Sequence, residues 1–278
     1  MSLAGAQSIS EVDYTQGIQL KSTALSFGGA YRAIADNNTA ILLNPAGLGF
    51  FDEKVSLAAD YTRVGRTASN AISISAVDAR ALPGIPFALS YDRDQPTLSG
   101  TAQINLNQIS AASAMRLGSM MSAGLTFKGY FTSTNSPLVS GPDGVDLDLG
   151  FMLRPASFLS FALTAQNVFN GGHFEEFPLV IGFGSALFLD PHAKLSIDIT
   201  RDFQTPANGK VNSHFGGELR MAEGIFLRGG FGIDQVRQNN FYAIGIALAG
   251  PKINLHFTFS QRLNPSSNTF ATGLEFYL

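Results

Sequence analysis

Segments of about ten residues, in which apolar and polar side chains alternate, recur along the chain from Glu53 to its end. In residues 194–200, Leu195, Ile197 and Ile199 alternate with polar residues, and residues 253–260 follow the same pattern. Because successive side chains of a strand point to opposite faces, each segment is predicted to be a strand with one apolar face. About fourteen segments fit this template, whose length suits a tilted strand that crosses a membrane.

The connections between these segments alternate between short and long. Short connections such as RLGS at residues 116–119 and AGPK at 249–252 are followed by longer polar ones, such as residues 133–144. Bacterial outer-membrane barrels have short turns on one rim, longer loops on the other and an even number of strands. The pattern therefore predicts an all-β protein, a transmembrane antiparallel β-barrel of about fourteen strands formed by residues 53–278.

Composition supports a surface that is only partly covered by water. Charged residues make up 14% of the chain, against about 25% in ordinary soluble domains. No apolar run is long enough for a spanning helix, which excludes a helical membrane protein. The net charge of −3 gives no basic footprint, so we expect no nucleic-acid partner. With no cysteine there are no disulfides, and because no signal peptide is visible, the start is expected to be artificial and placed on a mature N-terminus.

The end of the chain and its aromatic residues agree with a barrel. In TFATGLEFYL, the apolar residues Phe270, Leu274, Phe276 and Leu278 share one face, as in the last strand of outer-membrane barrels. Aromatic residues at segment ends are expected to form girdles at the two membrane interfaces. These are Tyr61, Tyr130, Phe131, Phe158, Phe203 and Tyr277.

The stretch before the strands has a different pattern. Residues 24–38 lack a period of two and suit a short helix, and Pro45 prevents a helix from continuing through the next segment. A segment this apolar, placed before a barrel whose outer face already meets lipid, is best buried in the lumen. We therefore expect residues 1–52 to form a hatch that plugs the barrel.

The hatch sequence resembles the N-terminal hatch of the FadL/TodX family of outer-membrane transporters for long-chain fatty acids and other hydrophobic compounds. The resemblance rests on a Gly-Ala pair, an Ala-x-Ala-Asp run and an Asn-Pro-Ala motif, in that order, within residues 28–51. It implies a fourteen-stranded barrel and passive uptake of hydrophobic small molecules, with hatch-gated and lateral release. The hatch residues that it implies are Gly28, Gly29, Ala30, Asp36, Asn44, Pro45 and Ala46.

In that family the Asn-Pro-Ala motif lies beside a kink in the third strand that opens the barrel wall. The connection before the third segment here holds Pro83 and Pro86, which cannot donate to a β-ladder. A wall opening is predicted there, and a longer turn is the alternative. In that family, extended outer loops with apolar side chains first capture the cargo, whereas the longest loop here, residues 133–144, is short and polar.

Small residues on the inner faces of three segments are predicted to make room for the hatch or for an apolar ligand. The predicted ligand-binding residues are Phe27, Tyr31, Gly182, Gly184, Gly230, Ala243 and Gly245. Other segments place charges inside, and the alternative is a packed, water-lined lumen with paired charges. These charged residues are Asp146, Asp148, Lys194, Asp198, His214, Glu218, Arg220, Arg228 and His256.

Catalytic and metal chemistry find little support. Asn254, His256 and Thr258 at strand spacing resemble part of a membrane phospholipase site, but no serine nucleophile follows the histidine. His214 and Glu218 are too far apart along a strand to hold one metal. We expect no enzyme activity, no cofactor and no metal.

The predicted protein is a monomer in the bacterial outer membrane. Its partners would be outer-membrane lipid and a hydrophobic small-molecule substrate. The alternative function is a non-transporting outer-membrane barrel that serves as a secretion partner or surface anchor.

Overall fold

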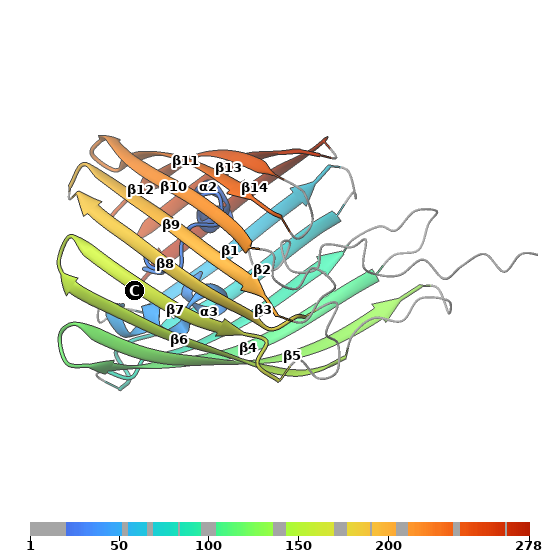
Figure 1. Cartoon of the computed structure of the whole chain (residues 1–278), viewed down its shortest axis with the longest axis horizontal. Helices are drawn as coiled ribbons and strands as arrows, with labels where there is room; N and C mark the ends of the chain where they lie inside the picture. Colours follow the sequence, from blue (N-terminus) through green and yellow to red (C-terminus); the bar gives the residue numbers. More distant parts are fainter. Residues whose placement is uncertain are drawn as a thin grey trace, which may run out of the picture.

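The computed structural model describes residues 21–51, 55–65, 69–82, 84–95, 104–135, 143–169, 177–189, 191–203, 211–235, 240–264 and 266–278. Fourteen described strands form one closed antiparallel barrel in which each strand pairs with its neighbours in sequence (Figure 1). The predicted architecture and strand number are therefore confirmed. No helix among the described residues is long and apolar enough to cross a membrane.

The strands have the following bounds: β1 Val55–Val64, β2 Ser69–Asp78, β3 Phe87–Gln95, β4 Ile104–Leu117, β5 Met121–Thr134, β6 Gly144–Ala156, β7 Leu159–Gln166, β8 Val180–Leu189, β9 Ala193–Asp202, β10 Val211–Ala222, β11 Ile225–Ile233, β12 Phe241–Ala249, β13 Ile253–Leu263 and β14 Ser266–Tyr277.

Pairing of β1 with β14 closes the barrel without an irregularity, from Ser56 opposite Tyr277 to Val64 opposite Thr269. The two register shifts in the described ladders lie at the ends of β6 and β10, next to short turns. In the short β4–β5 and β10–β11 turns, Gly118 and Gly224 adopt positive φ angles of 74° and 70°, a conformation that glycine adopts without steric cost. Short turns therefore mark one rim, which we call the short-turn rim.

The two faces of the wall follow the alternation in the sequence. On β9, Leu195, Ile197 and Ile199 are half exposed, whereas Ser196 and Asp198 between them are buried. The same alternation runs around the barrel, so that large apolar side chains cover its outside and polar side chains line its inside. This arrangement is inverted relative to a soluble domain, and it fits an outer surface that contacts hydrocarbon.

Two of the predicted girdle residues face inward instead. Tyr130 is 7% exposed and its ring stacks on Phe177, with the ring centroids 4.0 Å apart. Tyr277 is partly buried, and its hydroxyl donates to Glu275. Adjacent strand residues point to opposite faces, so Tyr130 and Phe131 could not both meet lipid, and Phe131 takes the outer position with 47% exposure.

The described part of the predicted hatch, residues 21–51, lies inside the barrel (Figure 1). It forms two short helices, α2 Ser22–Ser26 and α3 Ala40–Leu43, and a 3₁₀ helix, η2 Pro45–Phe50. Nearly all of its residues are buried. The predicted boundary between hatch and barrel falls at residues 52–54, outside the described residues, and stays a prediction.

A test of the lipid-facing surface uses two residues of similar exposure at different membrane depths. Ile244 lies near the middle of β12 and is 54% exposed, and Leu263 ends β13 and is 50% exposed. We expect Ile244→Arg to lower the free energy of unfolding in lipid vesicles by about 2–4 kcal/mol, and Leu263→Arg by about 0–1 kcal/mol. Equal effects, measured by denaturant titration, would contradict contact with hydrocarbon.

Candidate functional site

The Asn-Pro-Ala motif forms a tight turn at the start of η2. Asn44 Oδ1 accepts a hydrogen bond from the Ala46 amide at 3.1 Å, and Asn44 Nδ2 donates to the Arg32 carbonyl at 2.9 Å. Pro45 occupies the first position of η2, where its missing N–H has no intrahelical partner to lose. Asn44 therefore caps η2 and also ties it to an earlier part of the hatch.

Two wall glycines, Gly124 on β5 and Gly150 on β6, form the surface on which this turn rests. They are directly paired across the strands. A Cβ atom on Gly150 would lie 2.2 Å from Asn44 Oδ1, and one on Gly124 would lie 2.5 Å from the Pro45 carbonyl carbon. Neither glycine was predicted as a site residue, although glycine inside a strand is a signal of close backbone approach.

A second contact of this kind involves the Gly28-Gly29 turn. Both residues have positive φ angles, 61° and 87°. A Cβ atom on Gly230 of β11 would lie 2.1 Å from the Gly28 nitrogen, and one on Gly216 of β10 would meet the Phe27 carbonyl oxygen at 2.4 Å. His214 Nδ1 lies 2.7 Å from the Gly28 carbonyl oxygen and donates to it. The structure thus brings Gly28, Gly29 and Gly230 together, and adds Gly216.

Gly182 and Gly184 on β8 make room for Arg32 of the hatch. A Cβ atom on Gly182 would lie 2.7 Å from Arg32 Nε. Arg32 pairs with Asp198, whose Oδ2 also accepts backbone hydrogen bonds from Tyr31 at 3.0 Å and Arg32 at 2.9 Å. Because an unpaired buried charge is costly, this pair holds the hatch as well as neutralising its ions. Sequence reasoning placed Asp198 inside but did not identify its partner.

Of the remaining predicted ligand residues, Gly245 lies close to the hatch, Phe27 and Tyr31 belong to it, and Ala243 is buried in the wall. A Cβ atom on Gly245 would lie 2.6 Å from Ser26 Cβ, and Ala243 is buried. Phe27 and Tyr31 are 1% and 2% exposed and pack edge to face, with ring centroids 5.2 Å apart. In this arrangement the hatch takes the space over the small-residue wall. Direct ligand binding at these positions stays a prediction that requires the hatch to move.

The predicted wall opening can be traced only in part, because Pro83 lies outside the described residues. Pro86 directly precedes β3, and its carbonyl accepts from the Ser113 hydroxyl at 3.0 Å. The described ladders of β3 with β2 and with β4 run without a register shift. Residues 87–94 of β3 are therefore paired on both sides, and an opening stays a prediction.

A closed series of polar contacts joins Asp36 and Asn37 of the hatch to five strands, and we call it the polar ring. Lys194 Nζ lies 3.1 Å from Asp36 Oδ2 and 3.4 Å from Glu218 Oε1, and Arg228 Nε lies 2.7 Å from Glu218 Oε2. The members of the ring are Asp36, Asn37, Lys194, Glu218, Arg228, His256 and Glu275.

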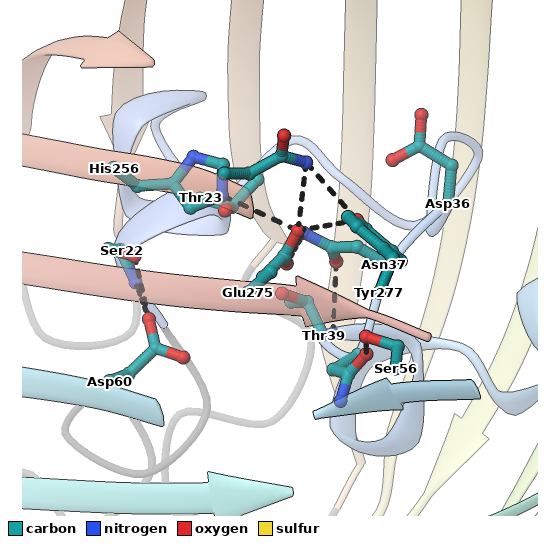
Figure 2. Close-up of polar contacts among 12 residues, drawn as sticks. Ser22, Thr23, Asp36, Asn37, Thr39, Ser56, Asp60, His256, Glu275 and Tyr277 are labelled. Carbon is teal, nitrogen blue, oxygen red and sulfur yellow. Dashed lines mark hydrogen bonds and ion pairs between the residues drawn. The ribbon is translucent and has the colours of Figure 1, made fainter. Parts of the chain in front are cut away.

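His256 and Glu275 complete the polar ring. Arg228 Nη1 lies 2.9 Å from His256 Nδ1. Because guanidinium nitrogens only donate, Nδ1 of His256 accepts this hydrogen bond. The N–H of the imidazole is therefore at Nε2, which lies 3.5 Å from Glu275 Oε2. The Asn37 amide donates to Glu275 at 2.7 Å, and Figure 2 shows the Asp36 carboxylate lying apart from this contact. The two neighbouring hatch residues thus hold opposite ends of one network.

Asp36 and Tyr31 have protonation states that suit this network. Burial raises the pKa of the Tyr31 hydroxyl well above its ordinary value, and the Asp36 carboxylate adds to the rise. For Asp36, removal from bulk water acts to raise the pKa, but the Lys194 ammonium and the Tyr31 hydroxyl outweigh it and lower the pKa. At neutral pH, Asp36 is therefore an anion that accepts a hydrogen bond from neutral Tyr31.

A cavity of about 790 Å³, which we call the vestibule, lies between the polar ring and the short-turn rim. It reaches from the hatch residues Tyr31 and Asp36 to the turn between β8 and β9 and the end of β14. Its lining is mixed, with Phe158, Phe188 and Phe226 beside the charged residues. Among the described residues, no three histidine, aspartate or glutamate side chains are grouped to hold a metal ion.

By sequence, the chain matches no protein-family profile and no curated protein. Its structure is similar to the CymD monoaromatic hydrocarbon channel, with a TM-score of 0.73, 11% identity and coverage of 96% of this chain and 98% of that one. A FadL homologue of Pseudomonas aeruginosa gives a TM-score of 0.69 at 10% identity, covering 92% and 98% of the two chains. The toluene transporter TbuX of Ralstonia pickettii gives 0.67 at 13%, covering 94% and 98%.

These neighbours are transport channels of the FadL/TodX kind, which agrees with the resemblance seen in the hatch motifs. At such low identities the likeness establishes the fold. The chain therefore has the fold of these channels.

The glycine contacts of the Asn-Pro-Ala turn can be tested with a matched pair of substitutions. Gly150→Ala places a methyl group against Asn44, whereas a Cβ atom on Gly129 of β5 would meet nothing within 4 Å. We expect Gly150→Ala to destabilise the hatch by about 1–3 kcal/mol through overpacking and to raise ion conductance in planar bilayers. Gly129→Ala should conduct like the unmodified protein, and identical conductance of both variants would contradict this contact.

The contribution of Asp36 to the free energy of unfolding is expected to fall at low pH and to stay constant at higher pH. Its pKa is lower in the folded protein, so its stabilising effect is present above its ordinary value of about 3.9 and is lost only as pH falls below that value. Because Asp36 and Lys194 are 38% and 30% exposed, Asp36→Asn should cost no more than about 1 kcal/mol.

The measurement is the difference in unfolding midpoint between Asp36→Asn and the unmodified protein from pH 8 to pH 3. We expect a constant difference down to about pH 4 and a decline below it. Glu223→Gln, on the exposed β10–β11 turn, is the control. A difference that vanished between pH 6 and pH 8 would show that Asp36 is not held as an anion.

Proposed function

We propose that this protein is a monomeric outer-membrane channel for the passive uptake of hydrophobic small molecules, gated by its hatch. The observation that carries the proposal is the Asn-Pro-Ala turn, which rests on wall glycines inside a barrel with the fold of hydrocarbon and FadL-type channels. Such cargo needs only apolar burial, worth about 25 cal/mol per Å², and no chemistry. No catalytic residue is required.

The position of the hatch supports gating. The described part of the hatch lies in the lumen and contacts β5 and β6 on one side and the polar ring on the other. We therefore expect cargo to pass only when part of the hatch moves. Because residues 87–94 of β3 are paired on both sides, lateral release beside them would require that movement to loosen the wall as well.

A second candidate is a non-transporting barrel that acts as a secretion partner or surface anchor. The burial of Phe27, Tyr31 and Pro45 favours it, because an open apolar pocket at these residues would have been direct support for a channel. A closed channel has the same appearance. The two candidates differ in transport, which can be measured.

The test compares uptake of a labelled long-chain fatty acid and of labelled toluene by cells that carry the protein, Asn44→Ala or no barrel. Asn44→Ala leaves the Arg32 carbonyl and the Ala46 amide without their partners, a loss of about 1–3 kcal/mol that loosens the hatch. We expect uptake with the unmodified protein and severalfold faster uptake with Asn44→Ala.

Asn70→Ala is the control, because Asn70 lies at the barrel exterior and bonds only Tyr61 in the described part. It should transport like the unmodified protein. If cells with and without the protein took up both compounds equally, transport would be excluded. Recovery of a bound secretion partner would then favour the second candidate.

A further inference from the structure

The charged side chains on the outer face of the barrel lie at different ends of the strands according to their sign. In the described strands, the outward-facing cations are Arg63 of β1, Arg93 of β3 and Arg201 of β9. Each lies within two residues of the end of its strand at the rim opposite the short turns, which we call the long-loop rim. The outward-facing acid, Asp78, ends β2 at the short-turn rim. The long-loop rim therefore presents positive charge to its surroundings.

Arg63 and Arg93 lie close together and have no acidic partner among the described residues. Arg63 is opposite Asn70, which is opposite Gln95, so the two arginines are two strands and two residues apart, about 12 Å between their Cα atoms. In the described part of the chain, no ion pair joins either guanidinium to an acid. Arg93 donates to the neutral amide oxygen of Asn105 at 2.8 Å.

The acids nearest in the sequence do not neutralise these two cations. Asp92 and Asp94 of β3 face the lumen, where both are buried. The connections after β1 and β3, GRTA at residues 65–68 and PTLSGTAQ at 96–103, contain no acidic residue. Two positive charges therefore face outward and can pair with an external anion.

Neutral hydrogen-bonding side chains surround the two arginines. The Tyr61 hydroxyl donates to Asn70 Oδ1 at 2.8 Å, and Gln95 donates to Asn105 Oδ1 at 2.6 Å. Because these amide oxygens accept, the amide N–H groups of Asn70 and Asn105 can donate to another molecule. Exposed apolar side chains on the same face, farther from the rim, are Ile74, Leu89 and Ile109. We use the name outer patch for Arg63, Asn70, Arg93, Gln95 and Asn105.

A headgroup with two phosphates and a sugar matches the outer patch. A guanidinium pairs with a phosphate through two parallel hydrogen bonds, so two arginines about 12 Å apart suit two phosphates on one molecule. The amide N–H groups can donate to sugar oxygens, and the apolar face below can cover acyl chains. A glycerophospholipid such as phosphatidylglycerol has one phosphate and would leave one arginine without a partner.

The position of the outer patch selects the source of such a lipid. In bacterial outer-membrane barrels the longer loops are extracellular, so the long-loop rim would border the outer leaflet. Lipids of that leaflet have a disaccharide headgroup with a phosphate at each end and several acyl chains. Charge, hydrogen-bonding groups and apolar surface follow one another down the strands in the order in which these lipids present their partners.

We infer that the outer patch binds a bisphosphorylated disaccharide lipid of the lipid A class, with one phosphate on Arg63 and the other on Arg93. Its acyl chains lie against the outer face of β2, β3 and β4. This site is on the outside of the wall, apart from the hatch and the lumen. The inference goes beyond the proposed function and rests on it only for the outer-membrane location.

The direct test is native mass spectrometry of the detergent-solubilised protein with diphosphoryl lipid A, monophosphoryl lipid A and phosphatidylglycerol. We expect Arg63→Gln and Arg93→Gln each to weaken binding of diphosphoryl lipid A about fivefold, the contribution of one cation beside an anionic headgroup. The double substitution should weaken it more than tenfold, and monophosphoryl lipid A should lose less. Unchanged binding of diphosphoryl lipid A by the double variant would overturn the inference.

Arg201→Gln is the matched control, because Arg201 is an outward-facing cation at the same rim, six strands away from β1 around the barrel. It should bind diphosphoryl lipid A like the unmodified protein. An equal loss in Arg201→Gln would indicate general charge attraction and overturn the assignment of a site. If the double variant lost phosphatidylglycerol binding as strongly as lipid A binding, a bisphosphorylated ligand would be contradicted.

The location is tested independently, because the chain has no cysteine. Asn70→Cys introduces a thiol in the outer patch, and Ser213→Cys introduces one on the outer face of β10 near the same rim. Labelling with a bulky maleimide should reduce binding of diphosphoryl lipid A only in Asn70→Cys. Equal binding by the two labelled proteins would place the lipid elsewhere and contradict the inference.

Uptake of labelled toluene by cells that carry the double variant separates this inference from the channel proposal. Lipid A binding that depends on Arg63 and Arg93, without uptake of any compound by the unmodified protein, would keep the site and remove the channel. Uptake together with unchanged lipid A binding by the double variant would keep the channel and remove the site.

Discussion

A peptide group in hydrocarbon finds no water to hydrogen-bond, and this constraint governs the whole molecule. Every backbone donor and acceptor of a spanning segment must be satisfied by the protein, and a sheet does so only when it has no edge. The regular pairing of β1 with β14 removes the last edge. Once the sheet is closed, its outward side chains must be apolar, and its inward side chains line a lumen that another part of the chain can occupy.

The chain supplies its own N-terminal segment, and the lumen is built around it. Where the hatch backbone meets the wall, the wall has glycine, at Gly124, Gly150 and Gly230. Where a hatch charge is buried, the wall has its counterion, as Asp198 has for Arg32. Steric fit and charge pairing act at different places, and together they give the hatch one position. Removing one member of a buried pair would leave an unpaired ion, which costs about 3–5 kcal/mol.

Much of the barrel could be predicted from the sequence. Side chains alternate with a period of two along a strand, and their polarity indicates which face meets lipid and which faces the lumen. Strand number and inward charges such as Glu218 and His256 follow from that period, and the two rims follow from the alternation of short and long connections. Partners do not follow, since the pairing of Lys194 with Asp36 joins residues that only the folded hatch brings together. Tyr130 shows the remaining limit, because an aromatic residue at a strand end indicates an interface only when parity also points outward.

The same lack of long-range information explains why the small-residue wall suggested a ligand site. Missing side chains reveal that something approaches the strand, but its identity depends on a segment more than a hundred residues away in the chain, as with Arg32 and Gly182. Two parts of the hatch, the Asn-Pro-Ala turn and the Asp36-Asn37 pair, consequently differ in what holds them. The Asn-Pro-Ala turn is enclosed by backbone on a dry, closely packed surface, where each displaced contact has no replacement. The polar ring faces a cavity. Its Asp36–Lys194 pair is partly exposed, so water can replace the contact between these two side chains at a cost of about 0–1 kcal/mol. The hatch is therefore held by steric fit at the Asn-Pro-Ala turn and by an exchangeable ion pair at Asp36, and Asp36 borders the vestibule.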